Sequence, residues 1–82
     1  MQPDTVTRVI GVIAKTQHIP VESIKPESTF QELNIDSMDG INIVFALENE
    51  FGVEIPDDDA KAIRGVADVA EGIEKLLRQK AG

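Results

Sequence analysis

The sequence predicts an all-α protein, a small four-helix bundle with three longer helices, one short helix and a long loop between the first two helices. In three segments, apolar residues recur at spacings of three and four, and no segment shows the alternation of a half-buried strand. The four prolines lie outside the apolar periodic runs, where they separate helices rather than interrupt them. We find no repeat or linker, so residues 1–82 are expected to form one domain.

The first helix is expected from about Pro3 to Thr16, because its apolar residues share one face of about 100°. These residues are Val6, Val9, Ile10 and Ile13. The next segment, roughly residues 17–35, contains Pro20 and Pro26 but is too apolar for a freely solvated loop. We therefore expect an ordered connection that packs across the bundle and contains a short turn of helix.

The second helix is expected to start at Asp36 and to end near Phe51. Asp36 suits the N-cap position, because its carboxylate can accept hydrogen bonds from the unpaired amides of the first turn. Asp39 adds negative charge where the helix dipole favours it. Gly52 is a suitable residue for ending the helix.

This second helix carries two apolar faces, which is more than one core stripe requires. The face expected to point into the bundle consists of Ile43, Val44, Leu47 and Phe51. The second face, rotated from it by more than about 100°, consists of Met38, Ile41 and Phe45. Either the long connection covers this second face as core, or it is an exposed apolar strip with acidic neighbours, as in interaction sites.

Two further helices complete the predicted bundle. A short one is expected from Asp57 to Ile63, entered through Pro56, and a last one from about Val66 to Gln79. The three consecutive acids at residues 57–59 suit the capping and dipole of the short helix. They do not form a calcium loop, which needs acids at alternating positions and a glycine at the sixth position, so no metal site is expected.

The composition excludes several classes of site and partner. Eight Lys and Arg against fifteen Asp and Glu give a net charge of −7, which repels nucleic acid. There is no cysteine and one histidine, His18, so thiolate and multi-histidine metal sites are excluded. Residues 26–60 contain ten acids and no base. This stretch is either a solvated face that maintains solubility or a docking surface for basic partners.

The sequence predicts neither a membrane span nor a secretion signal. No apolar run approaches the roughly 20 residues that a span needs. The first ten residues lack a basic start followed by an apolar stretch. We expect a cytoplasmic monomer.

A candidate functional motif, Ile-Asp-Ser-Met-Asp, lies at residues 35–39, where the second helix is expected to begin. With Leu-Asn before it, Ile-Val-Phe-Ala-Leu-Glu-Asn-Glu-Phe at residues 43–51 and Ile-Pro-Asp at residues 55–57, it resembles the acyl carrier protein family. The resemblance covers nearly the whole chain, from the first helix to about Leu77. It implies that Ser37, flanked by Asp36 and Met38, carries 4′-phosphopantetheine, which a phosphopantetheinyl transferase takes from coenzyme A.

The resemblance implies a carrier rather than an enzyme. Such a protein holds acyl intermediates as thioesters and presents them to enzymes of lipid, fatty acid or polyketide-type biosynthesis that have basic patches. The implied docking residues are Asp39, Ile41, Phe45, Glu48, Glu50 and Asp57. The candidate residues for shielding the acyl chain are Phe30, Val44, Leu47, Ile55, Ala60 and Ile63.

The sequence departs from the family pattern at five positions. Met38 replaces the usual Leu, Gly40 stands inside the helix, Asn42 and Asn49 are neutral where acids are frequent, and Asn34 stands where Gly is frequent. These changes favour a specialised acyl pathway. Because nearby carboxylates oppose a phosphodiester on Ser37, we expect the arm to be mobile rather than held.

Alternative functions remain open at this point. The chain can be an aminoacyl or peptidyl carrier, which shares the attachment motif, or an unmodified helical adaptor that has kept the fold. A hydrolase is disfavoured, because Ser37 lacks the Gly-x-Ser-x-Gly surroundings of a nucleophile and His18 is the sole imidazole.

Overall fold

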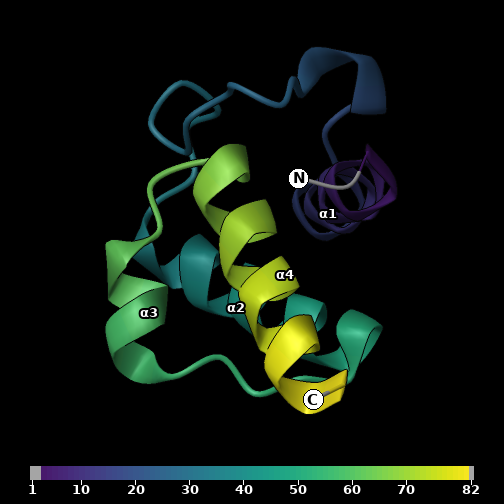
Figure 1. Ribbon diagram of the computed structural model, residues 1–82. Coiled ribbons are helices and arrows are strands. Elements are labelled where there is room, and N and C mark those ends of the chain that lie inside the picture. The colour runs from purple at the N-terminus through teal and green to yellow at the C-terminus, as the bar shows by residue number, and fades with distance from the viewer. Residues whose placement is uncertain (1–2, 82) are drawn as a thin grey trace.

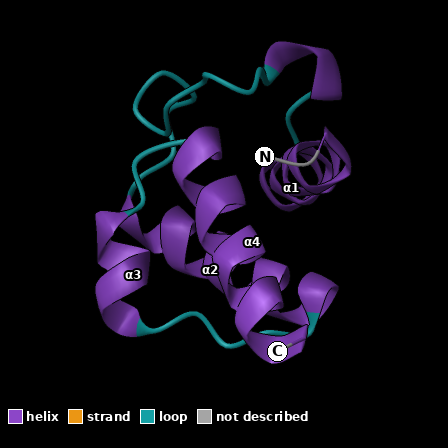
Figure 2. Ribbon diagram, viewed as in Figure 1, coloured by secondary structure: helices purple, strands orange, loops and turns teal. Residues whose placement is uncertain are grey.

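The computed structural model describes residues 3–81 of the chain. Within them the helices are α1 (Pro3–Gln17), α2 (Ser37–Phe51), α3 (Asp57–Ala62) and α4 (Val66–Ala81), with a short 3₁₀ turn η1 (Val21–Ser23) in the long connection. The described residues contain no strand, and their β-type pairing is one isolated bridge between Thr29 and Gly65. The all-α prediction is confirmed (Figure 2). A single domain over residues 1–82 stays a prediction, and residues 1, 2 and 82 lie outside the described residues.

The core lies where α1 packs against both α2 and α4. Helices α1 and α3 lie on opposite sides of the α2–α4 pair (Figure 1). The predicted apolar face of α1 supplies the buried Val9, Ile10 and Ile13. Helices α2 and α4 supply most of the other buried side chains, which include Ile43, Leu47, Phe51, Val66, Val69, Ala70 and Ile73.

The long connection between α1 and α2 is ordered, as predicted. Its Ile24 and Ile35 are buried in the core. It is also tied to the α3–α4 junction, because Phe30 N–H donates to the Arg64 carbonyl at 2.9 Å and Val66 N–H to the Ser28 carbonyl at 3.0 Å. The close approach requires glycine at residue 65, where an added Cβ would lie 2.7 Å from the Ser28 carbonyl oxygen.

Helix α2 begins and ends as its sequence predicts. The Asp36 carboxylate accepts a hydrogen bond from Asp39 N–H at 2.9 Å. At the other end, Gly52 adopts the left-handed conformation with φ of 65°, which glycine tolerates without strain. The short helix α3 ends at Ala62, one residue earlier than predicted, because Ile63 has an extended backbone.

Candidate functional site

Ser37 is the first residue of α2 and is exposed. Because Asp36 caps the helix, the Ser37 side chain stands at the surface beside the first, unpaired backbone amides. Such a helix start is a favourable place for a negatively charged group. The structure thus leaves this hydroxyl within reach of another protein.

Ser37 lies on a groove of about 770 Å³ between the start of α2, α3 and the long connection. This volume is within the range of roughly 300–1,000 Å³ that is typical of small-molecule sites. Gly40 also lines the groove, and a Cβ added there would meet nothing within 4 Å. The apolar lining consists of Phe30, Ile35, Ile41, Val44, Phe45, Ala60 and Ile63. The groove therefore offers an apolar surface next to the Ser37 hydroxyl.

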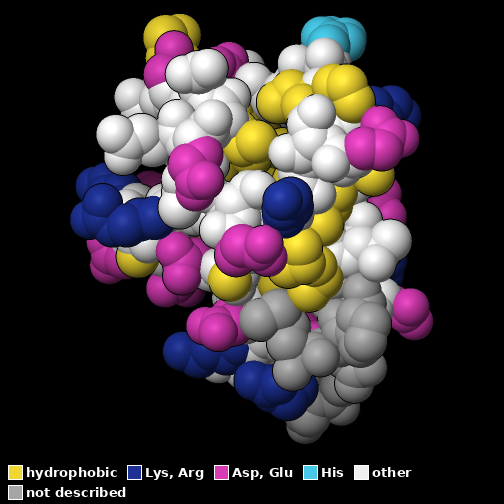
Figure 3. All heavy atoms as spheres, turned by 90° about the horizontal axis from the view of Figure 1, so that it is seen from above, with side chains coloured by type: hydrophobic (Ala, Val, Ile, Leu, Met, Phe, Trp, Pro, Cys, Tyr) yellow, Lys and Arg dark blue, Asp and Glu magenta, His cyan; other side chains and the backbone are white. Residues whose placement is uncertain are grey.

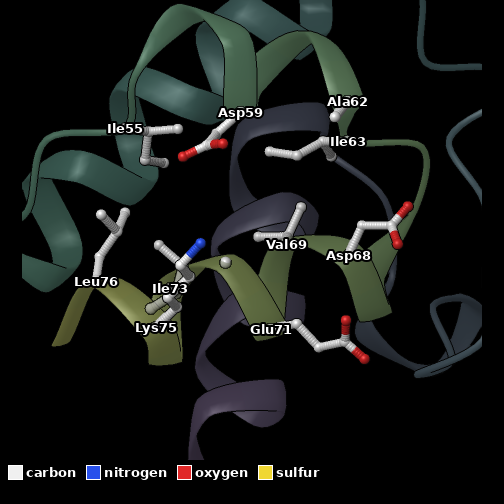
Figure 4. A pocket seen from close by; sticks show the side chains of 11 residues that line it. Ile55, Asp59, Ala62, Ile63, Asp68, Val69, Glu71, Ile73, Lys75 and Leu76 are labelled. Atoms are coloured by element: carbon white, nitrogen blue, oxygen red, sulfur yellow. The ribbon is translucent and has the colours of Figure 1, made fainter. Parts of the chain in front are cut away.

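Four of the six residues predicted to shield an acyl chain line this groove, namely Phe30, Val44, Ala60 and Ile63. The other two do not. Leu47 is fully buried in the core, and Ile55 lines a second hollow of about 300 Å³ between α3 and α4. In Figure 4, Ile55 and Ile63 point into this hollow from one side, and Val69 and Ile73 of α4 lie across from them. Ile63 lines both spaces, so it forms part of the wall between them.

The second apolar face of α2 is exposed. Met38 is 75% exposed, Ile41 55% and Phe45 62%. The long connection does not cover these side chains, so the interpretation of this face as core is wrong. Large exposed apolar residues on one stripe of a helix are the usual composition of a protein interaction site.

Two of the predicted docking carboxylates are engaged within the molecule. Glu48 Oε2 accepts a hydrogen bond of 2.7 Å from Ile55 N–H. Glu50 Oε2 forms an ion pair of 3.1 Å with Arg8, whose guanidinium also lies 4.3 Å from the centre of the Phe51 ring. Local periodicity could not reveal these contacts, because the partners lie 7 and 42 residues away.

The other docking candidates lie at the start of α2 and α3. Asp39 is partly exposed in the first turn of α2, and Asp57, the exposed first residue of α3, lines the groove. Asp36 lines the groove as well. Asp36 and Asp57 thus line the groove together with Ser37, whereas Asp39 is not among its lining residues.

Sequence reasoning missed two basic residues of the groove, Lys61 and Arg64. Both are exposed, and neither forms an ion pair with any described residue. A signal was present in the sequence, because these are the first bases after the acidic stretch of residues 26–60. Basic side chains also lie close to acidic and hydrophobic ones on the face of the molecule that carries the long connection (Figure 3).

Other kinds of site find little support among residues 3–81. No group of three His, Asp or Glu side chains is placed to hold a metal ion there. None of the helices described is long and apolar enough to cross a membrane. His18 is exposed at the end of α1 and is not among the residues that line the groove with Ser37.

Comparisons with known proteins agree with this geometry. A family profile described as a phosphopantetheine attachment site matches residues 7–73. The acyl carrier protein of Helicobacter hepaticus is 42% identical over 72 residues, which are 87% of this chain and 95% of that protein. That of Thermosynechococcus vestitus is 40% identical over 73 residues, 88% of this chain and 90% of that protein.

A longer relative and a solved structure extend the comparison. Acyl carrier protein 1, chloroplastic, of Casuarina glauca is 39% identical over 82 residues, but the chain spans 60% of that protein's length. The crystal structure of an acyl carrier protein from Thermotoga maritima superposes with a TM-score of 0.78 at 30% identity, covering 88% of this chain and 85% of that one. The likeness thus includes both the sequence and the arrangement of the helices.

Proposed function

The chain belongs to the acyl carrier protein family, and from this we propose that it carries acyl intermediates as thioesters on a 4′-phosphopantetheine arm attached to Ser37. The observation that carries the proposal is the position of Ser37, exposed at the head of α2 and on the rim of a largely apolar groove. The arm supplies a thiol, which this chain, having no cysteine, does not provide itself.

The residues around Ser37 fit such an arm. The exposed hydroxyl is accessible to a phosphopantetheinyl transferase, and the helix start suits the negative charge of the phosphodiester. Gly40, one turn further along, leaves space beside the attachment point. Asp36 and Met38 flank the serine and are proposed to be part of the motif that the transferase recognises.

The groove supports a second part of the proposal, the shielding of the acyl chain. Phe30, Val44 and Ile63 offer apolar surface, and burial stabilises an acyl chain by roughly 0.8 kcal/mol per methylene. A short chain is proposed to lie in the groove of about 770 Å³. A longer one would have to displace Ile63 to reach Ile55 in the second hollow, or penetrate the core at Leu47.

The exposed face of Met38, Ile41 and Phe45 is the proposed centre of the docking surface. We assign the accompanying negative charge mainly to Asp39 and Asp57, since Glu48 and Glu50 already have partners within the molecule. Exposed ion pairs contribute about 0–1 kcal/mol each and are screened by salt. Binding to basic patches on acyl-transferring enzymes would therefore be brief, which suits a carrier that moves from one enzyme to the next.

In this role the chain presents the cargo and its partner enzymes perform the chemistry. A specialised acyl pathway stays a prediction. The cytoplasmic location does too, since the similar proteins include chloroplastic and mitochondrial ones.

The proposal is tested by loading. The chain, first treated with coenzyme A and a transferase, is offered to an acyl-loading enzyme and to an aminoacyl-loading enzyme. We expect an acyl thioester that hydroxylamine releases and no aminoacyl product. Loading by the aminoacyl enzyme alone would identify an aminoacyl carrier, and a chain that accepts no arm would be the helical adaptor; either result contradicts the proposal.

A further inference from the structure

The groove beside Ser37 is charged as well as apolar. Its lining includes two acidic residues, Asp36 and Asp57, and two basic residues, Lys61 and Arg64. The basic side chains form no ion pair with either acid, although all four line one groove. Two exposed cations thus line the groove that also includes Ser37, and neither has an ion-pair partner among the described residues.

Backbone hydrogen bonds connect Arg64 to the segment that leads into Ser37. The Arg64 carbonyl accepts the Phe30 N–H at 2.9 Å, and the Phe30 carbonyl accepts the Ile35 N–H at 2.9 Å. Ile35 stands two residues before Ser37. Through these two backbone hydrogen bonds, Phe30 links Arg64 to the segment that leads into Ser37.

We propose that Lys61 and Arg64 bind the phosphodiester that joins the arm to Ser37, so that the first part of the arm lies along the groove. This inference rests on the proposed function. The phosphodiester adds a negative charge beside Asp36, and Lys61 and Arg64 are the positively charged residues of the groove lining. Arginine suits the task, because its planar guanidinium can donate two parallel hydrogen bonds to phosphate oxygens.

A carboxylate on the cargo is the alternative anion that Lys61 and Arg64 could bind. The phosphodiester is favoured because its position is fixed and that of the cargo is not. The phosphate is bonded to the Ser37 oxygen and so stays at the rim of the groove. The cargo is at the far end of the arm, where its position is free to vary. The carboxylates of Asp36 and Asp39 alone would repel the phosphodiester and leave the arm mobile. The positive charges of Lys61 and Arg64 counteract this repulsion.

The test compares the arm-free and arm-bearing forms by NMR. Attachment of the arm should shift the Arg64 Nε–H and Lys61 side-chain signals, and the ³¹P relaxation should report a phosphate restricted by the protein. A K61Q/R64Q variant should lose the restriction while still accepting the arm. The matched control is K75Q/R78Q, which removes two exposed cations of α4 outside this groove and should behave like the unmodified sequence.

Each outcome separates this inference from the function on which it rests. The inference is supported if the phosphate becomes mobile in K61Q/R64Q. It is also supported if the phosphate becomes mobile in about 1 M salt, where the screening length is about 3 Å. Normal attachment with equal ³¹P relaxation in all variants overturns it and leaves the proposed function intact. Lys61 and Arg64 signals that shift only when the arm carries a dicarboxylic acyl group also overturn it, because they would identify the free carboxylate of the cargo as the bound anion. Absence of attachment to Ser37 overturns both.

Discussion

The two faces of helix α2 differ in what they contact. One face is held by the rest of the molecule, with Ile43 and Leu47 fully buried in the core. Glu48 accepts the Ile55 N–H, and Glu50 pairs with Arg8 of α1. These contacts fix the end of the helix against the following loop and α1.

The other face has few such contacts. Met38, Ile41 and Phe45 are more than half exposed, and Ser37 is exposed beside the groove. The N-terminus is secured mainly by the Asp36 cap. The comparison teaches that one face of the helix stabilises the fold and thereby allows the other face, with the start of the helix, to expose residues for modification and docking.

Leu47→Ala should have the largest effect on stability. Truncating a fully buried leucine removes about 2–5 kcal/mol from the free energy of unfolding. Phe45→Ala, a larger truncation on the exposed face, should cost less than about 1 kcal/mol. Urea unfolding measures both values, and a Phe45 cost equal to that of Leu47 would contradict the division of the helix.

Glu48→Ala should lower the free energy of unfolding by about 1–3 kcal/mol, because it leaves the partly buried Ile55 N–H without its charged acceptor. Asn49→Ala, at the exposed neighbouring position, is the matched control and should have little effect. Urea unfolding distinguishes the two. Equal stability of both variants would show that Glu48 is available for docking after all.

Gly40→Ala should raise the free energy of unfolding by about 0.5–1 kcal/mol, since alanine is the better helix former and its Cβ would meet nothing within 4 Å. Thermal unfolding checks the sign. A destabilised variant would mean that the start of α2 around Gly40 is packed more tightly than the structure shows.

Glu50→Gln should have the smallest effect, at most about 1 kcal/mol, because both side chains of its ion pair with Arg8 are more than 40% exposed. The difference from the unmodified chain should shrink as salt is added. Unfolding curves at low and high salt measure it. A larger cost that salt does not change would point to a role for Glu50 beyond this pair.

Local patterns were sufficient for the features of the fold that depend on neighbours in sequence. The apolar spacing of residues 3–16 predicted α1, and Asp36 and Gly52 predicted the ends of α2. The exposure of Phe45 could not be decided in this way, because it depends on the path that the long connection takes.

The candidate site was predicted less completely than the fold. Ser37 followed from the motif, but the groove is formed by three separate segments of the chain. Leu47 and Ile55 share the apolar character of groove residues, yet tertiary packing places one in the core and the other in the second hollow. Lys61 and Arg64 were missed because their significance depends on lining the same groove as Ser37, which only the tertiary fold shows.

The intact mass of the chain after incubation with coenzyme A and a phosphopantetheinyl transferase tests the attachment site most directly. If Ser37 is that site, the unmodified sequence and Ser23→Ala, which alters another exposed serine, each gain one 4′-phosphopantetheine, and Ser37→Ala gains none. A gain that persists in Ser37→Ala, or no gain in the unmodified sequence, would contradict it.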